Sequence, residues 1–360
     1  MEKLTEPVSG SFFEIPPLYC PLPSAINPNV QDVERRNIEW MTGLGLCDDP
    51  EQRTRLLGCH AADWCCRIAP DGALSGLQIF TDWTSMGLIF DDAHLDRGPT
   101  SRRPEELIPI LMRMAHALDH PEAQVGDDPF TAGYRNLSQC IREKRSGESS
   151  SEWADATTQW WFAAAGLVSY RAASRTPSLA DYMVIGPRDR GTRATISFIE
   201  LAEETSLPPA LREAPRVRAV SHATCLLMTI GNDLFSFHRE NAENTLESNI
   251  VGVLASENRT SLHTALACAV ALHDCIMCLF LDLTKALEHN AGEPLKRYLA
   301  QLGHLVRGNL EYSLIVPRYN SEVTGISPAL LDSIEWAEKP SARRLDAPQI
   351  PAIAWLWDQL

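Results

Sequence analysis

The 360-residue sequence contains little that is typical of secreted, membrane-bound or nucleic-acid-binding proteins. Its first residues, MEKLTEPVSGSFFEIPPLYCPLP, are acidic and proline-rich and have no long apolar core, so they do not resemble a secretory signal. Aspartate and glutamate outnumber lysine and arginine by 47 to 32, and the net charge of −15 disfavours nucleic acid and anionic membranes as partners. We therefore expect a cytoplasmic protein with free thiols.

Signals for β-strands are also nearly absent. Alternating β-branched residues between tight turns do not occur, whereas helical periodicity recurs throughout. The chain also lacks a long linker or an internal repeat, so we predict a single all-α domain over residues 1–336, with an N-terminal strap at about 1–27. The proline-broken segment 337–360 is expected to be a C-terminal tail. The predicted helices span 28–44, 50–69, 73–92, 103–119, 128–147, 150–174, 178–185, 194–204, 209–240, 245–255, 260–289, 293–315 and 327–335.

Two segments have some features of a membrane span or a zinc site but fit neither. The most apolar stretch, 264–287, is interrupted by Asp274 and Asp282, so we expect a buried core helix rather than a membrane span. The cysteines and histidine of CHAADWCC, residues 59–66, are not followed by a second ligand pair at zinc-finger spacing. We therefore expect no zinc.

The polar residues of NDLFSFHRE, residues 232–240, stand out because they follow a strongly apolar helical run. Asn232, Ser236 and Glu240 recur at intervals of four, so they line one strip of the helix. Continued backward, the strip runs into residues typical of a core. Oxygen-bearing side chains on a core face are costly unless something binds them.

A second polar cluster, DDAHLD, ends the helix predicted at 73–92. On a helical wheel Asp91 points in the direction of this helix's apolar face, where an unpaired carboxylate would be costly or protonated. A divalent cation would remove that cost. Asp92 and Asp96 share a neighbouring face, and regular helical geometry does not place all three on one strip, so Asp91 is predicted to be the principal ligand. Taken alone, the cluster would also fit a solvated acidic helix end.

Together the two strips offer only hard oxygen donors: carboxylates, an amide and a hydroxyl. This set favours Mg²⁺ or Mn²⁺ over zinc or copper. Mg²⁺ usually completes its coordination with water and phosphate oxygens. Two such sites facing each other across a helical bundle would therefore hold a diphosphate.

The paired motifs resemble those of class I terpene synthases. In that family an aspartate-rich motif ends one core helix, and the pattern Asn-Asp-x-x-Ser-x-x-x-Glu lies on a facing helix. The resemblance covers roughly residues 12–320 and implies an all-α bundle around a central active-site cavity that binds three Mg²⁺ ions, with Mn²⁺ as a possible substitute. The spacing between Asp92 and Asp96 is one residue longer than the usual pattern. The implied metal ligands are Asp91, Asp92, Asp96, Asn232, Ser236 and Glu240.

The resemblance also implies a set of diphosphate-binding residues. The family places an arginine that senses diphosphate upstream of the motif's asparagine, and a spacing of 44 residues selects Arg188. Gly186–Pro187 is expected to break the helix there and let the arginine move. Spacing alone favours Arg188 over Arg190 and Arg193, and a basic surface loop is the alternative.

Three further positions complete the implied site. The residue before the motif's glutamate is usually basic, and here it is Arg239. Arg318 and Tyr319 match an Arg-Tyr pair that donates to diphosphate, although Tyr312 stands where many members have tryptophan. The implied catalytic residues are Asp91, Arg188, Arg239, Arg318 and Tyr319.

The implied reaction is the metal-assisted ionisation of a linear isoprenoid diphosphate, followed by cyclisation of the carbocation in a dry cavity. Farnesyl diphosphate is the favoured substrate and geranylgeranyl diphosphate the alternative. Aromatic faces can stabilise the cation, and the candidates are Phe80, Trp83, Trp160, Trp161 and Phe162. A chain-elongating prenyltransferase is disfavoured because the second motif is not aspartate-rich. A catalytically silent isoprenoid-binding protein of the same fold is also disfavoured, because that motif is intact. The protein is expected to be a monomer or homodimer.

We predict that chelation of divalent cations with EDTA abolishes turnover. Mg²⁺ should restore it and Zn²⁺ should not, because every implied ligand is a hard oxygen. Diphosphate release measured before and after each addition tests this, and full turnover in EDTA would refute the metal assignment.

Overall fold

The computed structural model describes residues 14–145, 149–319, 334–342 and 348–360. Within these ranges the chain is helical and forms no strand, which confirms the all-α prediction. The elements are α1 (Val30–Gly43), α2 (Pro50–Cys59), α3 (Ala61–Ile68), α4 (Leu74–Phe90), η1 (Asp91–Asp96), η2 (Pro99–Arg102), α5 (Pro104–Asp119), α6 (Pro129–Lys144), α7 (Ser149–Ala172), α8 (Leu179–Asp189), α9 (Thr192–Ala202), α10 (Pro209–Arg212), α11 (Pro215–Glu243), η3 (Leu246–Ser248), α12 (Ile250–Asn258), α13 (Leu262–Glu288), α14 (Glu293–Ile315), α16 (Pro351–Ala354) and η4 (Trp357–Gln359).

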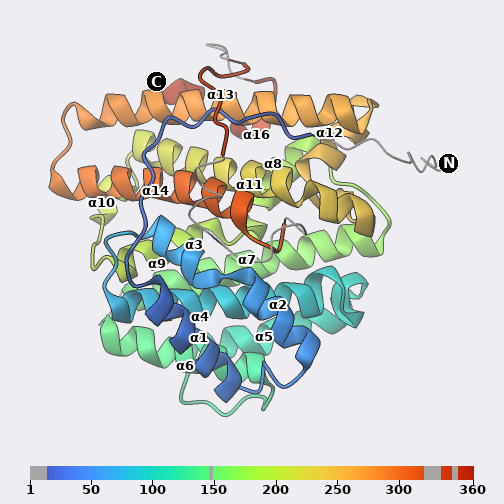
Figure 1. Ribbon diagram of the computed structural model, residues 1–360, viewed down its shortest axis with the longest axis vertical. Helices are drawn as coiled ribbons and strands as arrows, with labels where there is room; N and C mark the ends of the chain where they lie inside the picture. Colours follow the sequence, from blue (N-terminus) through green and yellow to red (C-terminus); the bar gives the residue numbers. More distant parts are fainter. Residues whose placement is uncertain (1–13, 146–148, 320–333, 343–347) are drawn as a thin grey trace.

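The helices are stacked along the long axis of the molecule, from α13 at one end to α6 at the other (Figure 1). Helix α11 packs against both α13 and α14, and α14 in turn packs against α3. Helix α4 packs against α1, α3 and α9, while α7 packs against α5, α8 and α9. This order brings the end of α4 and the second half of α11, which carry the two polar motifs, to the middle of the bundle.

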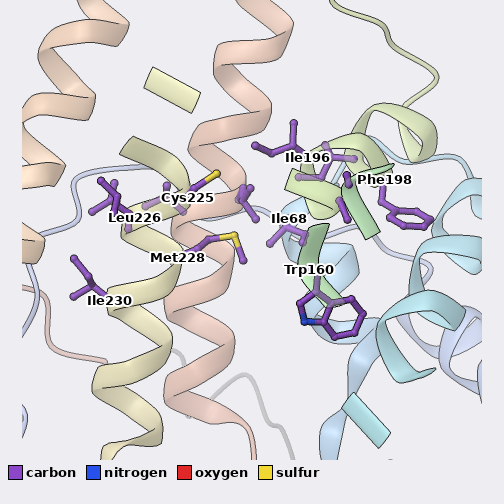
Figure 2. Packing of buried hydrophobic residues seen from close by; sticks show 14 of the residues in the cluster. Ile68, Trp160, Ile196, Phe198, Cys225, Leu226, Met228 and Ile230 are labelled. Atoms are coloured by element: carbon purple, nitrogen blue, oxygen red, sulfur yellow. The ribbon is translucent and has the colours of Figure 1, made fainter. Parts of the chain in front are cut away.

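The core continues from α11 across to α7 and α9. Figure 2 shows Met228 extending from α11 toward Ile68 and Trp160, while Leu226 and Ile230 point away from them. All of these side chains are buried. Helix α11 is therefore enclosed on several sides, so its polar strip lies within the bundle rather than on its surface.

Helix α13 is long and apolar enough to cross a bilayer, with a mean hydropathy of 2.0 over its most apolar window. Within the protein, however, 72% of that window is buried. The burial agrees with the expectation of a core helix.

Several helix boundaries differ from the prediction. The helix expected at 50–69 is divided at His60, whose φ of 45° is left-handed. The helix expected at 209–240 is divided into α10 and α11, and the one expected at 178–185 continues through Pro187 to Asp189. The expected break at Gly186–Pro187 is therefore wrong: the chain turns at Gly191 instead, with φ of 61°. The predicted helix 327–335 lies mostly outside the described residues.

The N-terminal strap and the C-terminal segment are both fastened to α13. The buried carboxylate of Asp274 accepts hydrogen bonds from the backbone N–H groups of Tyr19 at 3.2 Å and Ser341 at 2.7 Å. The described part of the last segment also buries Ile353 and Leu356. The described parts of both segments thus pack on the helical body.

Helices α4 and α9 approach closely at Gly76. A Cβ atom at this position would lie 2.6 Å from the Cα of Ala202, so we expect Gly76→Ala to lower the free energy of unfolding by about 1–3 kcal/mol. Gly166 in α7 is the matched control, because a Cβ there meets nothing within 4 Å. Gly166→Ala should instead raise stability by about 0.5–1 kcal/mol. Thermal unfolding monitored by circular dichroism tests whether the two substitutions change stability in opposite directions. Equal changes in stability would contradict the close packing at Gly76.

Candidate active site

The aspartate-rich segment forms a single π-helical turn, η1, directly after α4. In a π-helix the hydrogen bonds join residues five apart, so Asp96 returns to the side of the helix on which Asp91 lies. Ligand oxygens of Asp91, Asp92 and Asp96 all lie within 4.8 Å of one another. The expectation that helical geometry separates the three is therefore wrong, and Asp96 belongs to the cluster.

The charges of this cluster are held at a cost. Burial raises the pKa of Asp91 well above its usual range, and repulsion from Asp96 adds to the effect. Burial also opposes ionisation of Asp92, but Arg318 donates to both of its carboxylate oxygens at 2.9 Å and holds its pKa below the usual range. A divalent cation placed here would favour the charged form of all three carboxylates.

The α11 strip faces the same pocket. Asn232 and Glu240 line it together with Asp91 and Asp96, whereas the buried Ser236 and Asp92 are not among its lining residues. The two predicted motifs therefore converge on one cavity. The oxygen donors of both motifs fit the preferences of Mg²⁺ or Mn²⁺.

Burial raises the pKa of Glu240 to about 7, although Arg190 opposes the shift. Its carboxylate is fixed by Asn249, whose Nδ2 donates to Oε2 of Glu240 at 2.9 Å and to the carbonyl of Asp233 at 2.7 Å. The Oδ1 of Asn249 accepts the N–H of Val251 and so caps α12. Sequence reasoning missed Asn249. Its place before an apolar run signals a helix N-cap, but not its reach back to α11.

The arginine that enters the pocket near α8 is Arg190 rather than Arg188. Arg190 lines the cavity, and its Nη2 donates to the buried carboxylate of Asp233 at 2.6 Å. Arg188 is exposed and donates to the carbonyl of Val184 on its own helix at 2.6 Å. Because α8 continues through Pro187, Arg188 points outward. The arginine that spacing selected therefore lies outside the cavity.

Gly191 makes the inward turn of this segment possible. Its positive φ favours glycine, and a Cβ at this position would lie 3.4 Å from the Trp83 ring and 3.6 Å from the Trp160 ring. Arg190 therefore stands 42 residues before Asn232, instead of the 44 used for the prediction. Arg193, the third basic residue of the segment, is exposed and donates to Gln159.

Arg239 and Arg318 enter the cavity as predicted. Nη2 of Arg239 lies 3.4 Å from a carboxylate oxygen of Asp96, so this arginine links α11 to η1. Tyr319 lies beside the α11 strip, because its hydroxyl accepts a hydrogen bond from Nδ2 of Asn232 at 2.8 Å. The Arg239 guanidinium stands over its ring, 5.9 Å from the centroid.

Three guanidinium groups at the cavity have a hydrogen-bond donor that is not paired. The Nε–H groups of Arg190, Arg239 and Arg318 are buried and find no acceptor among the described residues. A buried N–H without an acceptor costs about 1–3 kcal/mol. All three arginines line the same cavity, so their positive charges favour an anion with several oxygens, such as a diphosphate.

The cavity wall away from the charged groups is aromatic. Trp83 and Trp160 line it as predicted, with ring centroids 5.7 Å apart. Phe80 lies behind Trp83 and stacks on Phe198. The other two candidates are elsewhere: Trp161 packs edge-on against Tyr134, and Phe162 is 80% exposed.

Trp64, Asn309 and Tyr312 complete the wall. Trp64 Nε1–H donates to Oδ1 of Asn309 at 3.1 Å, which orients the amide and leaves its buried Nδ2 without an acceptor among the described residues. Sequence reasoning missed Trp64 and Asn309, because neither belongs to a recognisable motif. Tyr312 donates to the carbonyl of Cys59 and occupies the position where the resemblance expects tryptophan.

Comparison with known proteins agrees with this geometry. Residues 82–277 match the family model described as terpene synthase family 2, C-terminal metal binding. The chain is a member of the terpene synthase family. It is 31% identical to spiroviolene synthase of Streptomyces violens over 96% of this chain and 97% of that one. It is 29% identical to the (2E,6E)-farnesyl diphosphate-cyclizing (+)-T-muurolol synthase of Streptomyces clavuligerus, over 94% of this chain and 81% of that one.

The fold of this terpene synthase matches solved structures equally well. The crystal structure of the SVS_A2 protein from ancestral sequence reconstruction superposes with a TM-score of 0.86 at 31% identity, covering 96% of this chain and 100% of that one. The chain is therefore a microbial class I terpene cyclase, which confirms the resemblance seen in its motifs.

We predict that Arg190→Lys severely impairs the synthase, whereas Arg188→Lys and Arg193→Lys leave it close to wild type. Lysine cannot reproduce the planar fork of Arg190, and loss of two charge-assisted hydrogen bonds at roughly 1.5–3 kcal/mol each would lower the rate by about a hundredfold or more. The measurement is the rate of diphosphate release by each variant at saturating Mg²⁺ and substrate. If Arg188→Lys were inactive and Arg190→Lys active, the assignment of this role to Arg190 would be wrong.

Proposed function

We propose that this terpene synthase ionises a linear isoprenoid diphosphate with the help of Mg²⁺ and cyclises the resulting carbocation, with farnesyl diphosphate as the first candidate substrate. One observation carries the proposal: two motifs of oxygen ligands meet across a cavity that three arginines with unused donors also line. A silent binding protein would have no need for this complete set.

The residues proposed to hold metal are the cluster on η1 and the strip on α11. Bound Mg²⁺ would supply a Lewis acid that neutralises charge developing on the departing diphosphate. The carboxylates have little freedom to move, because Arg318 holds Asp92 and Asn249 holds Glu240. This preorganisation lowers the cost of assembling the site.

Arg190, Arg239, Arg318 and Tyr319 are proposed to bind the diphosphate. Each arginine is already anchored to a carboxylate of the site, so its position is set before substrate arrives. The buried Nε–H of each is free to donate to a phosphate oxygen. The donors would stabilise the leaving group while it separates from the allylic carbon.

The aromatic wall is proposed to receive the hydrocarbon chain. Faces of Trp64, Trp83, Trp160 and Tyr312 can stabilise a cation by cation–π attraction, and their bulk excludes water that would end the cyclisation early. Support for farnesyl diphosphate comes from the relative whose name specifies that substrate. Geranylgeranyl diphosphate is the second candidate, and the cavity lining does not select between the two lengths.

We predict that the protein forms a cyclic product from one of these two diphosphates. We also predict that Glu240→Gln releases no diphosphate. The amide keeps the shape but removes the charge expected to bind metal. Glu243→Gln on the same helix is the matched control, because Glu243 pairs with Arg97 outside the cavity and should be dispensable. Gas chromatography and mass spectrometry of incubations with each diphosphate identify the substrate. An active Glu240→Gln, or no product from either diphosphate, would contradict the proposal.

A further inference from the structure

Arg171, near the end of α7, is a buried arginine that joins three separate segments. Its Nε donates to the carboxylate of Glu247 at 2.6 Å, and its Nη2 donates to the hydroxyl of Ser248 at 2.9 Å. Its Nη1 donates to the carbonyl of Leu95 and, more weakly at 3.5 Å, to that of Ser101. The side chain is only 5% exposed. Neither motif includes it.

Two of the four acceptors of Arg171, Leu95 and Ser248, each directly precede a residue that belongs to or supports one metal motif. Leu95 belongs to η1 and directly precedes Asp96. Ser248 directly precedes Asn249, whose amide holds the carboxylate of Glu240. A single guanidinium therefore stands between the backbone of the aspartate cluster and the loop that fixes the end of the α11 strip.

Arg171 differs from the other arginines of the cavity in what it touches. Arg239 and Arg318 contact carboxylates that are themselves proposed ligands, so a bound cation would share those carboxylates with them. Arg171 contacts no oxygen of the six proposed ligands, so its hydrogen bonds can persist with the site empty or filled. Its Nε also has an acceptor, unlike the Nε of Arg190, so it has less capacity to bind diphosphate.

We propose that Arg171 is a positioning residue that couples the two metal motifs by holding η1 at a fixed distance from the 245–249 loop. The proposal rests on the proposed function, since it concerns how the ligand sets are held for a shared cluster of cations. The planar guanidinium donates to four acceptors in fixed directions, which a lysine ammonium at the same position cannot do. Loss of the coupling leaves each motif free to shift relative to the other.

The test is a titration of the protein with Mn²⁺ in the presence of inorganic diphosphate. Electron paramagnetic resonance measures the free Mn²⁺, and a titration without protein is subtracted to correct for Mn²⁺ bound by diphosphate alone. Arg171→Lys should weaken the apparent Mn²⁺ affinity by about tenfold or more, because at least one charge-assisted hydrogen bond is lost. Ser248→Ala removes one acceptor only and should weaken binding by a smaller factor. The double variant should bind no more weakly than Arg171→Lys alone, as expected when the two residues act through one contact.

Arg212→Lys is the matched control. Arg212 is a partly buried arginine that donates to both carboxylate oxygens of Glu200, at 2.9 and 2.8 Å, away from the cavity. Its replacement should lower the thermal unfolding temperature without changing Mn²⁺ affinity. Circular dichroism verifies that each variant is folded. If Arg171→Lys does not fold, the Mn²⁺ affinity of Ser248→Ala tests the proposal instead.

The outcomes separate this inference from the function on which it rests. If the wild-type protein binds no Mn²⁺ in the presence of diphosphate, the proposed function itself fails. If the wild type binds and both Arg171→Lys and Ser248→Ala bind equally well, only the coupling role of Arg171 is overturned. The same is true if Arg212→Lys weakens binding as much as Arg171→Lys does.

Discussion

Repulsion between neighbouring carboxylates that are partly or fully buried is the constraint on which this active site depends. Asp91, Asp92 and Asp96 lie close together, and Asp91 and Asp96 line the same cavity as Glu240. Burial makes each charge more expensive than in water, and neighbouring charges of the same sign add to the cost. The raised pKa values of Asp91 and Glu240 express this directly.

The protein offsets the repulsion with arginines rather than by separating the acids. Arg318 neutralises Asp92, Arg239 lies against Asp96, and Arg190 pairs with the buried Asp233 beneath the α11 strip. Each of these arginines keeps a buried Nε–H that has no acceptor among the described residues, and all three arginines line the cavity. The arrangement as a whole is suited to a ligand that brings cations and phosphate oxygens together, because such a ligand satisfies both sets of charges.

Periodicity was sufficient to predict an all-helical chain and the inward direction of the Asn232, Ser236 and Glu240 strip and of Asp91, because spacing along a regular helix determines direction. It failed where the backbone departs from a regular α-helix. The π-helical turn at Asp91–Asp96 brings Asp96 back to the cluster, and neither π-helices nor the passage of α8 through Pro187 can be derived from spacing. For this reason the arginine that lines the cavity is Arg190 and not Arg188, which spacing had selected.

Contacts between distant segments were equally out of reach from sequence. Asn249 reaches back to α11, Arg171 joins α7 to two loops, and Trp64 meets Asn309 from a helix 245 residues away. None of these residues belongs to a repeating pattern, and each acquires its role only when the helices are packed. The motifs could therefore be read from the chain, while the groups that hold them in place required the fold.

The central claim is that both motifs bind cations around one diphosphate, and its most direct test is diffraction from crystals grown with Mn²⁺ and inorganic diphosphate. Anomalous scattering locates manganese independently of the protein's own density. The account predicts manganese in contact with the Asp91–Asp96 cluster and with Asn232, Ser236 and Glu240, and diphosphate between them within reach of Arg190, Arg239 and Arg318. Diphosphate bound in the cavity with manganese at neither motif would contradict it.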